Sequence, residues 1–405
     1  MRKEDWINNM TDSTRQINTY IDSKRDTYCS MADEIFDHPE SGFEETFACG
    51  LLTGYLEKEG FQVERGIAGI PTAFRAVYGS GQGGPSIGLL CEYDAIMGMG
   101  HACGHHAQGP AVLAAADAVK TLCKDKPYRL VIYGTPAEET DGGKILMKER
   151  GCFQDIDVAL MMHPSPTTTT DIKCMALIPY QVTFYGKASH AAMAPEKGRS
   201  ALDAILLAAH GIECLREHVK EDTRLHYTIL DAGGPSNAVP SKASAEFCIR
   251  SYNTDYLLTV AERVKKIMEG AALMTETRYE IIEKPVFQAK IPVLSLNRTL
   301  MSRAEEFNAP SIRPPREKTG STDFGNIMYD IPGSCIRVAF VPEGTSAHSQ
   351  EYLDAGKSEA AHLCTTTAAK ILAGTCIDLI EKGELLEEVK KEFHDKKEAM
   401  GKEGI

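Results

Sequence analysis

The stretch Leu89–Gly109, LLCEYDAIMGMGHACGHHAQG, decides the fold class because it joins an apolar segment to a helix through a histidine-rich loop. Leu89–Cys91 is apolar and is followed by Glu92 and Asp94, which predicts a buried strand that ends in carboxylates. The next segment, AVLAAADAVKTLC, has the periodicity of a helix. A strand, a loop and a helix in this order are typical of an α/β protein.

The loop carries four histidine and cysteine side chains within six positions: His101, Cys103, His105 and His106. Thiolates and imidazoles are the ligands that zinc-like metals prefer. Because the loop precedes a helix, we expect the helix dipole to favour the thiolate of Cys103. The alternative is a set of buried thiol and imidazole groups without a metal, since unpaired cysteine is common in protein cores.

The composition predicts a globular protein with two domains, because 405 residues are too many for one ordinary core. Hydrophobic residues make up 43% and charged residues 25% of the chain, and the net charge is -13. This acidity favours neither nucleic acid nor an anionic membrane surface as a partner. The polar start predicts no signal peptide, and no apolar run suggests a membrane span. Twelve cysteines without an export signal predict reduced thiols and a cytoplasmic location.

Three further apolar segments lead into residues that can bind metals. Arg129–Gly134 precedes Glu138 and Glu139, Val158–Met162 precedes His163, and Cys335–Val341 precedes a loop that carries His348. In open α/β sheets, ligand sites gather at the carboxyl ends of strands. We therefore expect five side chains to converge: Cys103, His105, Glu138, Glu139 and His163. Mixed sulfur, nitrogen and oxygen ligation would come from Cys103, His105, Glu139, His163 and His348.

This ligand mixture fits zinc, manganese, cobalt or nickel better than magnesium or calcium. Five ligands exceed one tetrahedral site and predict two ions, about 3.5–4 Å apart as in hydrolytic two-metal sites. Glu138 would then be free to act as a general base for a metal-bound water. Taken alone, the glutamate pair would more often be a solvated turn, and His163 and His348 would be ordinary loop histidines.

The pattern of predicted strands and helices changes between residues 177 and 291. Strands and helices follow there in the order β-α-β-β-α-β, the split βαβ or ferredoxin-like pattern. We therefore predict one domain formed by 1–176 and 292–405, with 177–291 inserted as a second. His190 in the insert is either an oxyanion donor or a turn-packing residue. Arg250 is either a carboxylate ligand or, more commonly, a surface ion-pair partner, and Asn237 is a further polar candidate.

Seven segments occur in fixed order between about His38 and the helix after Tyr352: EYDAIMGMGHACGHH, TPAEE, MMHP, KASHAA, SNAVP, GSTDFGN and AHSQEY. In this order they resemble the aminoacylase and acetylornithine-deacetylase family of metal-dependent peptidases and amidohydrolases. HACGH, together with GIPTAF and EYDA, looks like the amidohydrolase branch with cysteine in its first metal motif. That branch includes the aminoacylase-like and aminobenzoyl-glutamate-hydrolase-like enzymes.

The resemblance implies a zinc-peptidase-like α/β catalytic domain with an inserted dimerisation or lid domain. It also implies the five ligands named above, with Cys103 as the bridging ligand and Glu138 as the base. His190 would act across a homodimer interface on the partner's substrate. Further residues are implied near the substrate, and Asp94 would orient a metal-binding histidine; the substrate-side residues are Asn237, Arg250, Gly320, Ser321 and Asp323.

The chain departs from the family pattern beside the cleft. His106 stands where the group often has Asp or Asn, and Ile96-Met97 where it often has Leu-Pro. The predicted function is a metal-dependent amidohydrolase of N-acyl or N-aminoacyl amino acids, dipeptides or aryl-amide conjugates. One alternative is an aminohydrolase that deaminates a small aromatic amine with the same site. Another is a non-catalytic metal or small-molecule binding protein, which would have no need of Glu138.

Overall fold

The computed structural model describes residues 11–403 and divides them into two compact units. The first comprises residues 11–173, 291–319 and 326–397. The second comprises residues 174–290, 320–325 and 398–403. The predicted domain limits, 1–176 with 292–405 and 177–291, stay a prediction.

The first unit is built on a seven-stranded sheet, in which four central strands are parallel and the outer strands are antiparallel. Apolar residues dominate the central strands, as expected where helices cover both faces of a parallel sheet. In spatial order the strands are β1 (Gln62–Arg65), β2 (Phe74–Ser80), β4 (Tyr128–Gly134), β3 (Ser86–Cys91), β5 (Val158–Ser165), β11 (Gly333–Ala339) and β6 (Thr169–Thr170).

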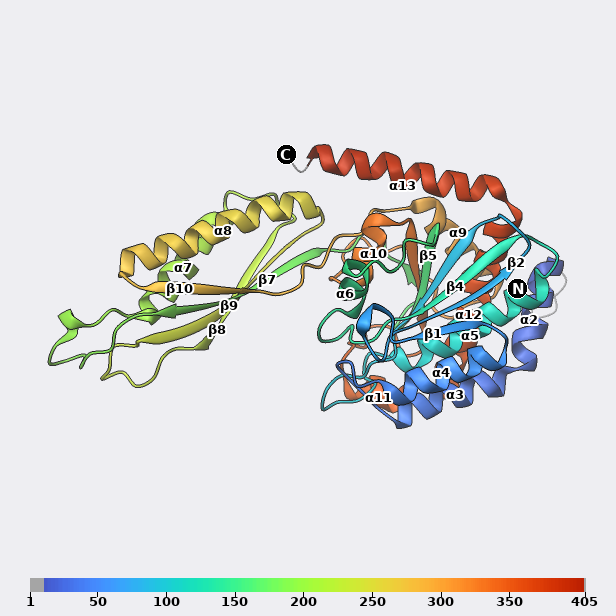
Figure 1. Cartoon of the computed structure of the whole chain (residues 1–405), viewed down its shortest axis with the longest axis horizontal. Helices are drawn as coiled ribbons and strands as arrows, with labels where there is room; N and C mark the ends of the chain where they lie inside the picture. Colours follow the sequence, from blue (N-terminus) through green and yellow to red (C-terminus); the bar gives the residue numbers. More distant parts are fainter. Residues whose placement is uncertain (1–10, 404–405) are drawn as a thin grey trace. The chain divides into compact units, whose positions relative to one another are not determined.

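The helix α12 (Glu359–Glu381) packs on both helices and strands of this unit (Figure 1). It contacts α5, α9, β5 and β11. The helices of this part of the chain are α2 (Asp12–Ser23), α3 (Arg25–Asp37), α4 (Thr46–Lys58), α5 (Gln108–Leu122), α6 (Gly143–Glu149), α9 (Leu294–Glu306), α10 (Phe324–Asp330), α11 (Gln350–Ala355), α12 (Glu359–Glu381) and α13 (Gly383–Glu403), with short 3-10 turns η1 (Ile67–Gly69) and η2 (His105–Ala107).

One expectation about α12 was wrong. By length and composition it is apolar enough to cross a membrane, although no apolar run was expected to reach that length. Its most apolar stretch is 83% buried inside the protein. A helix that packs on helices and strands along most of its surface needs apolar residues all round. The burial therefore explains the composition as that of a core helix.

The second unit has the predicted βαββαβ order, which is confirmed. Its elements are β7 (Ala176–Tyr185), η3 (Pro195–Lys197), α7 (Ala201–Arg216), β8 (Arg224–Asp231), β9 (Lys242–Ser251), α8 (Thr254–Thr275) and β10 (Arg278–Glu283). Its antiparallel sheet has the spatial order β10-β7-β9-β8.

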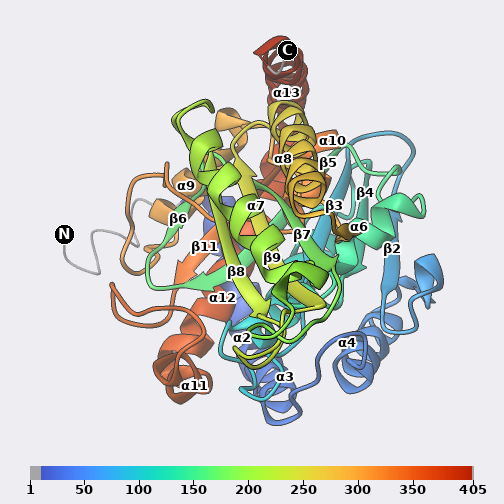
Figure 2. The same ribbon diagram turned by 90° about the vertical axis from the view of Figure 1, so that its left-hand side faces the viewer.

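Local sequence explains why these elements form where they do. The side chains of Ser200 and Asn253 cap α7 and α8 by accepting backbone N–H bonds. The two helices pack side by side and contact β7 and β9 (Figure 2). Buried residues alternate with more exposed ones along β9, so one face of that strand is turned to the core. The other face, which carries Arg250, stays more open.

Candidate metal centre

The six predicted metal and base residues of the first unit come together at the carboxyl ends of its parallel strands. Ligand atoms of Cys103, His105 and His163 lie within 4.8 Å of one another, and so do those of Cys103, Glu139 and His348. A third group within this distance joins His105 to both Glu138 and Glu139. The strand-end rule therefore predicted the convergence correctly, although the individual roles stay a prediction.

Two contacts show how close the donor atoms are. Cys103 Sγ lies 3.6 Å from His163 Nε2, and Glu139 Oε1 lies 3.2 Å from His348 Nε2. His105 Nε2 and Glu139 Oε1 are buried, and between residues 11 and 403 neither makes a hydrogen bond of good geometry, although Glu92 and His348 lie near them. Buried polar atoms without a partner are costly, and a cation would satisfy both. The residues present therefore fit a metal site with sulfur, nitrogen and oxygen ligands.

Asp94 connects two of the loops that carry predicted ligands. One of its carboxylate oxygens lies 3.0 Å from His105 Nδ1, and the other accepts the backbone N–H of Glu139 at 2.9 Å. With Nδ1 bound to Asp94, His105 turns Nε2 toward the other ligands. This contact supports the orienting role that the resemblance implied for Asp94, and the role itself stays a prediction.

Two residues in the loops that carry predicted ligands have a strained backbone conformation. Ala137, just before Glu138, has a positive φ of 59°, and His348 has a φ of 60°. Such conformations are unfavourable for residues other than glycine and need support from their surroundings. Ala137 donates its N–H to the buried carboxylate of Glu45 at 2.9 Å, while His348 donates its N–H to Ala102 O at 3.0 Å. The pKa of Glu45 is raised by burial.

The electrostatics of the ligands correct one expectation. Burial raises the pKa of the Cys103 thiol to about 12, so the nearby helix does not make it a thiolate by itself. The turn η2 separates Cys103 from the first residue of α5, and desolvation outweighs the dipole. Binding of a metal would therefore displace a proton from this thiol. Burial, and after it the charge of Arg337, lowers the pKa of His163 to about 3, which leaves a neutral imidazole.

Sequence reasoning assigned no role to a buried ion pair behind His105. Glu92 Oε2 lies 3.3 Å from His105 Nε2. Lys144 Nζ donates to Glu92 Oε1 at 2.6 Å, and the Gln108 amide donates to Oε2 at 2.6 Å. These side chains are at most 1% exposed. The sequence indicated a buried carboxylate only through the position of Glu92 at the end of a strand. It gave no indication of its partner, because a lysine in a helix is usually on the surface.

Two histidines of the first motif do not join the ligands. His101 and His106 pack their rings against Phe36, and His106 Nε2 is 2.9 Å from Gly356 O. The structure therefore gives His106 a packing contact beside the metal loop. Met97, the other departure from the family pattern, is 75% exposed.

The remaining predicted residues belong to the second unit, where four of them lie in two pairs and Asp323 is buried. His190 is exposed, and its Nδ1 accepts the backbone N–H groups of Ala192 and Met193, both at 3.2 Å. Its neighbour Ala191 donates to Asn237 O at 2.9 Å. Because Nδ1 is an acceptor, the neutral ring carries its proton on Nε2.

The second pair is Arg250 and Ser321. Arg250 Nη1 donates to Ser321 Oγ at 3.1 Å, and Gly320 next to it is exposed. The Nε atom of Arg250 contacts His226 Nε2 at 3.3 Å. The predicted substrate roles of this pair, of Gly320 and of Asn237 stay predictions.

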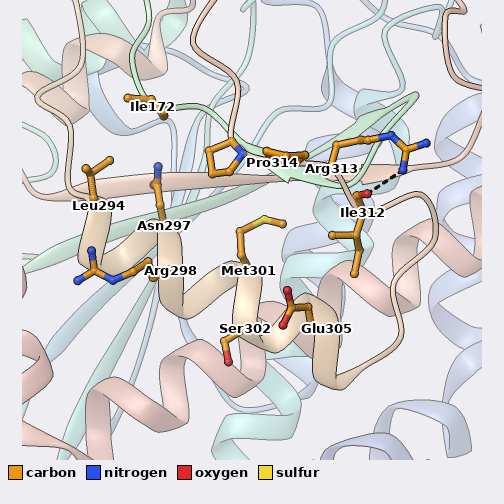
Figure 3. A pocket seen from close by; sticks show the side chains of 11 residues that line it. Ile172, Leu294, Asn297, Arg298, Met301, Ser302, Glu305, Ile312, Arg313 and Pro314 are labelled. Atoms are coloured by element: carbon orange, nitrogen blue, oxygen red, sulfur yellow. Dashed lines mark hydrogen bonds between the residues drawn. The ribbon is translucent and has the colours of Figure 1, made fainter. Parts of the chain in front are cut away.

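A separate cavity of about 680 Å³ contains none of the predicted site residues. It lies between α9 and the segment that carries Ile312 and Pro314 (Figure 3). Leu294, Asn297 and Met301 line its helical wall. Volume alone therefore does not identify the chemical site of this protein.

Comparison with known proteins gives the family. The model of peptidase family M20/M25/M40 matches residues 89–373. The chain belongs to this family. It is 32% identical to one of the p-aminobenzoyl-glutamate hydrolase subunits of Escherichia coli (strain K12), covering 95% of each chain. It is also 35% identical to the Xaa-Arg dipeptidase of Mus musculus, covering 92% of this chain and 90% of that one.

A solved structure supports the fold. The YXEP protein of Bacillus subtilis, described as a dinuclear metal binding peptidase, matches with a TM-score of 0.66 at 18% identity, over 87% of this chain and 99% of that one. The predicted fold class, an α/β catalytic unit with an inserted βαββαβ unit, is confirmed. The predicted family is confirmed as well, and the protein is an amidohydrolase, an enzyme that acts on amide bonds.

Proposed function

We propose that the protein is a two-metal amidohydrolase whose substrates are N-acyl or N-aminoacyl amino acids, dipeptides, or aryl-amide conjugates such as aminobenzoyl-glutamate. One observation carries the proposal: a complete set of sulfur, nitrogen and oxygen donors surrounds one small site, with an additional carboxylate beside it. The names of the relatives, an aminobenzoyl-glutamate hydrolase and a dipeptidase, support these substrate classes.

The chemistry follows from the residues of the site. Two divalent ions held by the five ligands would polarise the amide carbonyl and allow water to ionise near neutral pH. Glu138 takes a proton from the attacking water and passes it to the departing amine. His190, with its proton on Nε2, donates a hydrogen bond to the carbonyl oxygen as negative charge develops there.

Zinc is the ion that we propose first, with manganese, cobalt and nickel as alternatives. A thiol and three imidazoles favour borderline-soft ions over magnesium or calcium. The carboxylate of Glu139 adds the oxygen ligand that zinc, manganese and cobalt also accept.

We further propose a homodimer in which His190 serves the partner's site. His190 is exposed, as a residue that reaches another protomer must be. The edge strand β8 carries exposed apolar residues, since Tyr227, Ile229 and Leu230 are 39%, 41% and 52% exposed. Unpaired edges with apolar side chains favour association. A cytoplasmic location is proposed because all twelve cysteines are free thiols.

The test is reconstitution of metal-free protein with zinc, manganese, cobalt or nickel, one ion at a time. Each form receives acyl-amino acids, dipeptides, aminobenzoyl-glutamate and small aromatic amines, and free amino acid and ammonia are measured separately. We expect release of an amino acid or aryl amine from an amide only when an ion is present. Release of ammonia alone would favour the aminohydrolase. Tight metal binding without turnover of any compound would favour the binding protein.

A further inference from the structure

His106, one of the departures from the family pattern, has no role in the chemistry described above. Its ring lies 5.0 Å from that of Phe36, measured between centroids, and its Nε2 donates to Gly356 O at 2.9 Å. A carbonyl oxygen only accepts hydrogen bonds, so Nε2 carries a proton. Between residues 11 and 403, Nδ1 is buried without a hydrogen-bond partner. An apolar ring would fill the same space without that cost, so the bond to Gly356 is what a histidine adds here.

Gly356 ends the segment that begins with the predicted ligand His348. The short helix α11 lies between these two residues. At the start of the segment, His348 donates its backbone N–H to Ala102 O at 3.0 Å. At its end, Gly356 O accepts the hydrogen bond from His106. Both anchors therefore belong to residues 102–106, the stretch of the first motif that also carries two of the predicted ligands.

His348 depends on such anchors more than other predicted ligands do. Of those, one stands on β5 itself and two are held by Asp94. The side chain of His348 is 50% exposed, its φ is 60°, and it follows β11 only after a loop. The ring of Tyr352 packs on Phe340 and holds the middle of the segment on the core. Hydrogen bonds at both ends then fix the direction in which the segment runs, which a single bond would not do.

We propose that His106 is a positioning residue, which fixes the segment 348–356 so that His348 reaches Cys103 and Glu139. Ligand atoms of these last three residues lie within 4.8 Å of one another. The inference rests on the proposed function, because it concerns one of the two metal ions proposed there. Removal of a group that orients a metal ligand typically lowers metal affinity by about 10- to 100-fold. Loss of the bond should therefore weaken binding of the ion that needs His348 and leave the other ion bound as before.

The experiment measures zinc binding to the metal-free full chain by competition with a chelator, and counts bound ions by elemental analysis. His106→Phe keeps a ring and removes the donor. His106→Gln places an amide N–H near the position of Nε2 and should restore the bond. His101→Phe is the matched control, because His101 packs on the same Phe36 ring. Among the described residues, the ring nitrogens of His101 have no hydrogen-bond partner, so this control removes no bond to the segment 348–356.

The wild type should bind two zinc ions per subunit. His106→Phe should bind one of them as tightly as the wild type does and the other about 10- to 100-fold more weakly. His106→Gln and His101→Phe should both stay close to the wild type. The inference is overturned if His106→Phe binds both ions as the wild type does, or if His101→Phe loses as much affinity. Should His106→Phe fail to fold, His106→Asn takes its place, because its amide is too short to reach Gly356 O.

A second comparison separates positioning of His348 from a general loss of stability. His106→Phe is repeated in a His348→Ala background, in which the ligand itself is missing. If His106 acts through His348, the substitution should cause no further loss of zinc affinity there. A loss as large as in the wild-type background would overturn the inference. These measurements use no substrate, so absence of turnover in the wild type would overturn the proposed function without affecting them.

Discussion

The buried ion pair of Lys144 and Glu92 gives a prediction whose magnitude follows from the structure. Both side chains are at most 1% exposed, and their charged atoms are 2.6 Å apart. Lys144→Met keeps much of the volume and removes the charge. Removal of one partner from a buried pair costs about 3–5 kcal/mol, because it leaves an uncompensated charge. Glu92 would keep the Gln108 amide, which does not neutralise it. We expect Lys144→Met to destabilise the metal-free protein by about this amount.

The assay is urea unfolding followed by circular dichroism, with and without added zinc. Because Glu92 lies 3.3 Å from His105 Nε2, an ion at His105 would replace part of the missing positive charge. The loss should therefore be smaller in the metal-loaded protein. Lys148→Met is the matched control, since Lys148 stands on the same helix and pairs with Asp330 at a partly exposed site. Its cost should stay below about 1 kcal/mol.

A double-mutant cycle decides whether the pair itself is responsible. Glu92→Gln combined with Lys144→Met removes both charges, and the double variant should cost less than the sum of the single ones. Residues in direct contact show coupling of about 0.5–3 kcal/mol. The reasoning is refuted if the two costs simply add, or if Lys144→Met costs no more than Lys148→Met.

Three further predictions concern the site and the core. Glu138→Gln should lower kcat by about 10²- to 10⁴-fold through loss of the general base, with metal content unchanged by elemental analysis. Asp94→Asn should weaken metal affinity by about 10- to 100-fold, measured by competition with a chelator, because Asp94 orients His105. Burial alone would raise the pKa of Asp378, but Arg303 lowers it below its usual value. This pair therefore stabilises the protein above the unfolded-state pKa near 4, about where unfolded aspartates titrate. This stability is lost as the pH falls toward the folded pKa. In a plot of the unfolding midpoint against pH, the decrease at low pH should therefore be smaller for Asp378→Asn than for the wild type.

Much of the site could be predicted because the patterns that place its residues lie within short stretches of the sequence. Hydrophobic runs locate the parallel strands, and side chains that follow such strands meet at one edge of the sheet. Glu139 and His163 are 24 positions apart in the numbering of the chain, yet both are placed by the strands that precede them. The βαββαβ order of the second unit was equally readable from alternating apolar segments.

The sequence could not distinguish ligands from packing residues inside one loop. His101 and His105 stand four positions apart and have the same chemistry. In the structure, His105 turns toward Asp94 and the other donors, whereas His101 packs against Phe36. Which of them turns inward depends on contacts with α3 and with the end of β3. Those contacts bring together residues far apart in sequence, and spacing does not encode them.

The helix-dipole argument for Cys103 failed for a related reason. It used the position of the thiol before a helix, which sequence shows, and ignored burial, which sequence does not. Cys103 is 7% exposed, and desolvation dominates its pKa. The same limit applies to Lys144, which looks like a surface lysine until the fold places it opposite Glu92.

Three carboxylates near the predicted ligands share one physical feature. Glu45, Glu92 and Asp94 are buried carboxylates, and each joins a segment outside its own strand or loop: Glu45 bonds Ala137, Glu92 bonds Lys144, and Asp94 bonds the N–H of Glu139. Burying a charge is unfavourable unless hydrogen bonds compensate it. The hydrogen bonds that these three groups accept compensate their burial. The same bonds hold two segments at a fixed separation near the ligands. We infer that the donor atoms are positioned before any ion binds, which reduces the reorganisation that binding requires.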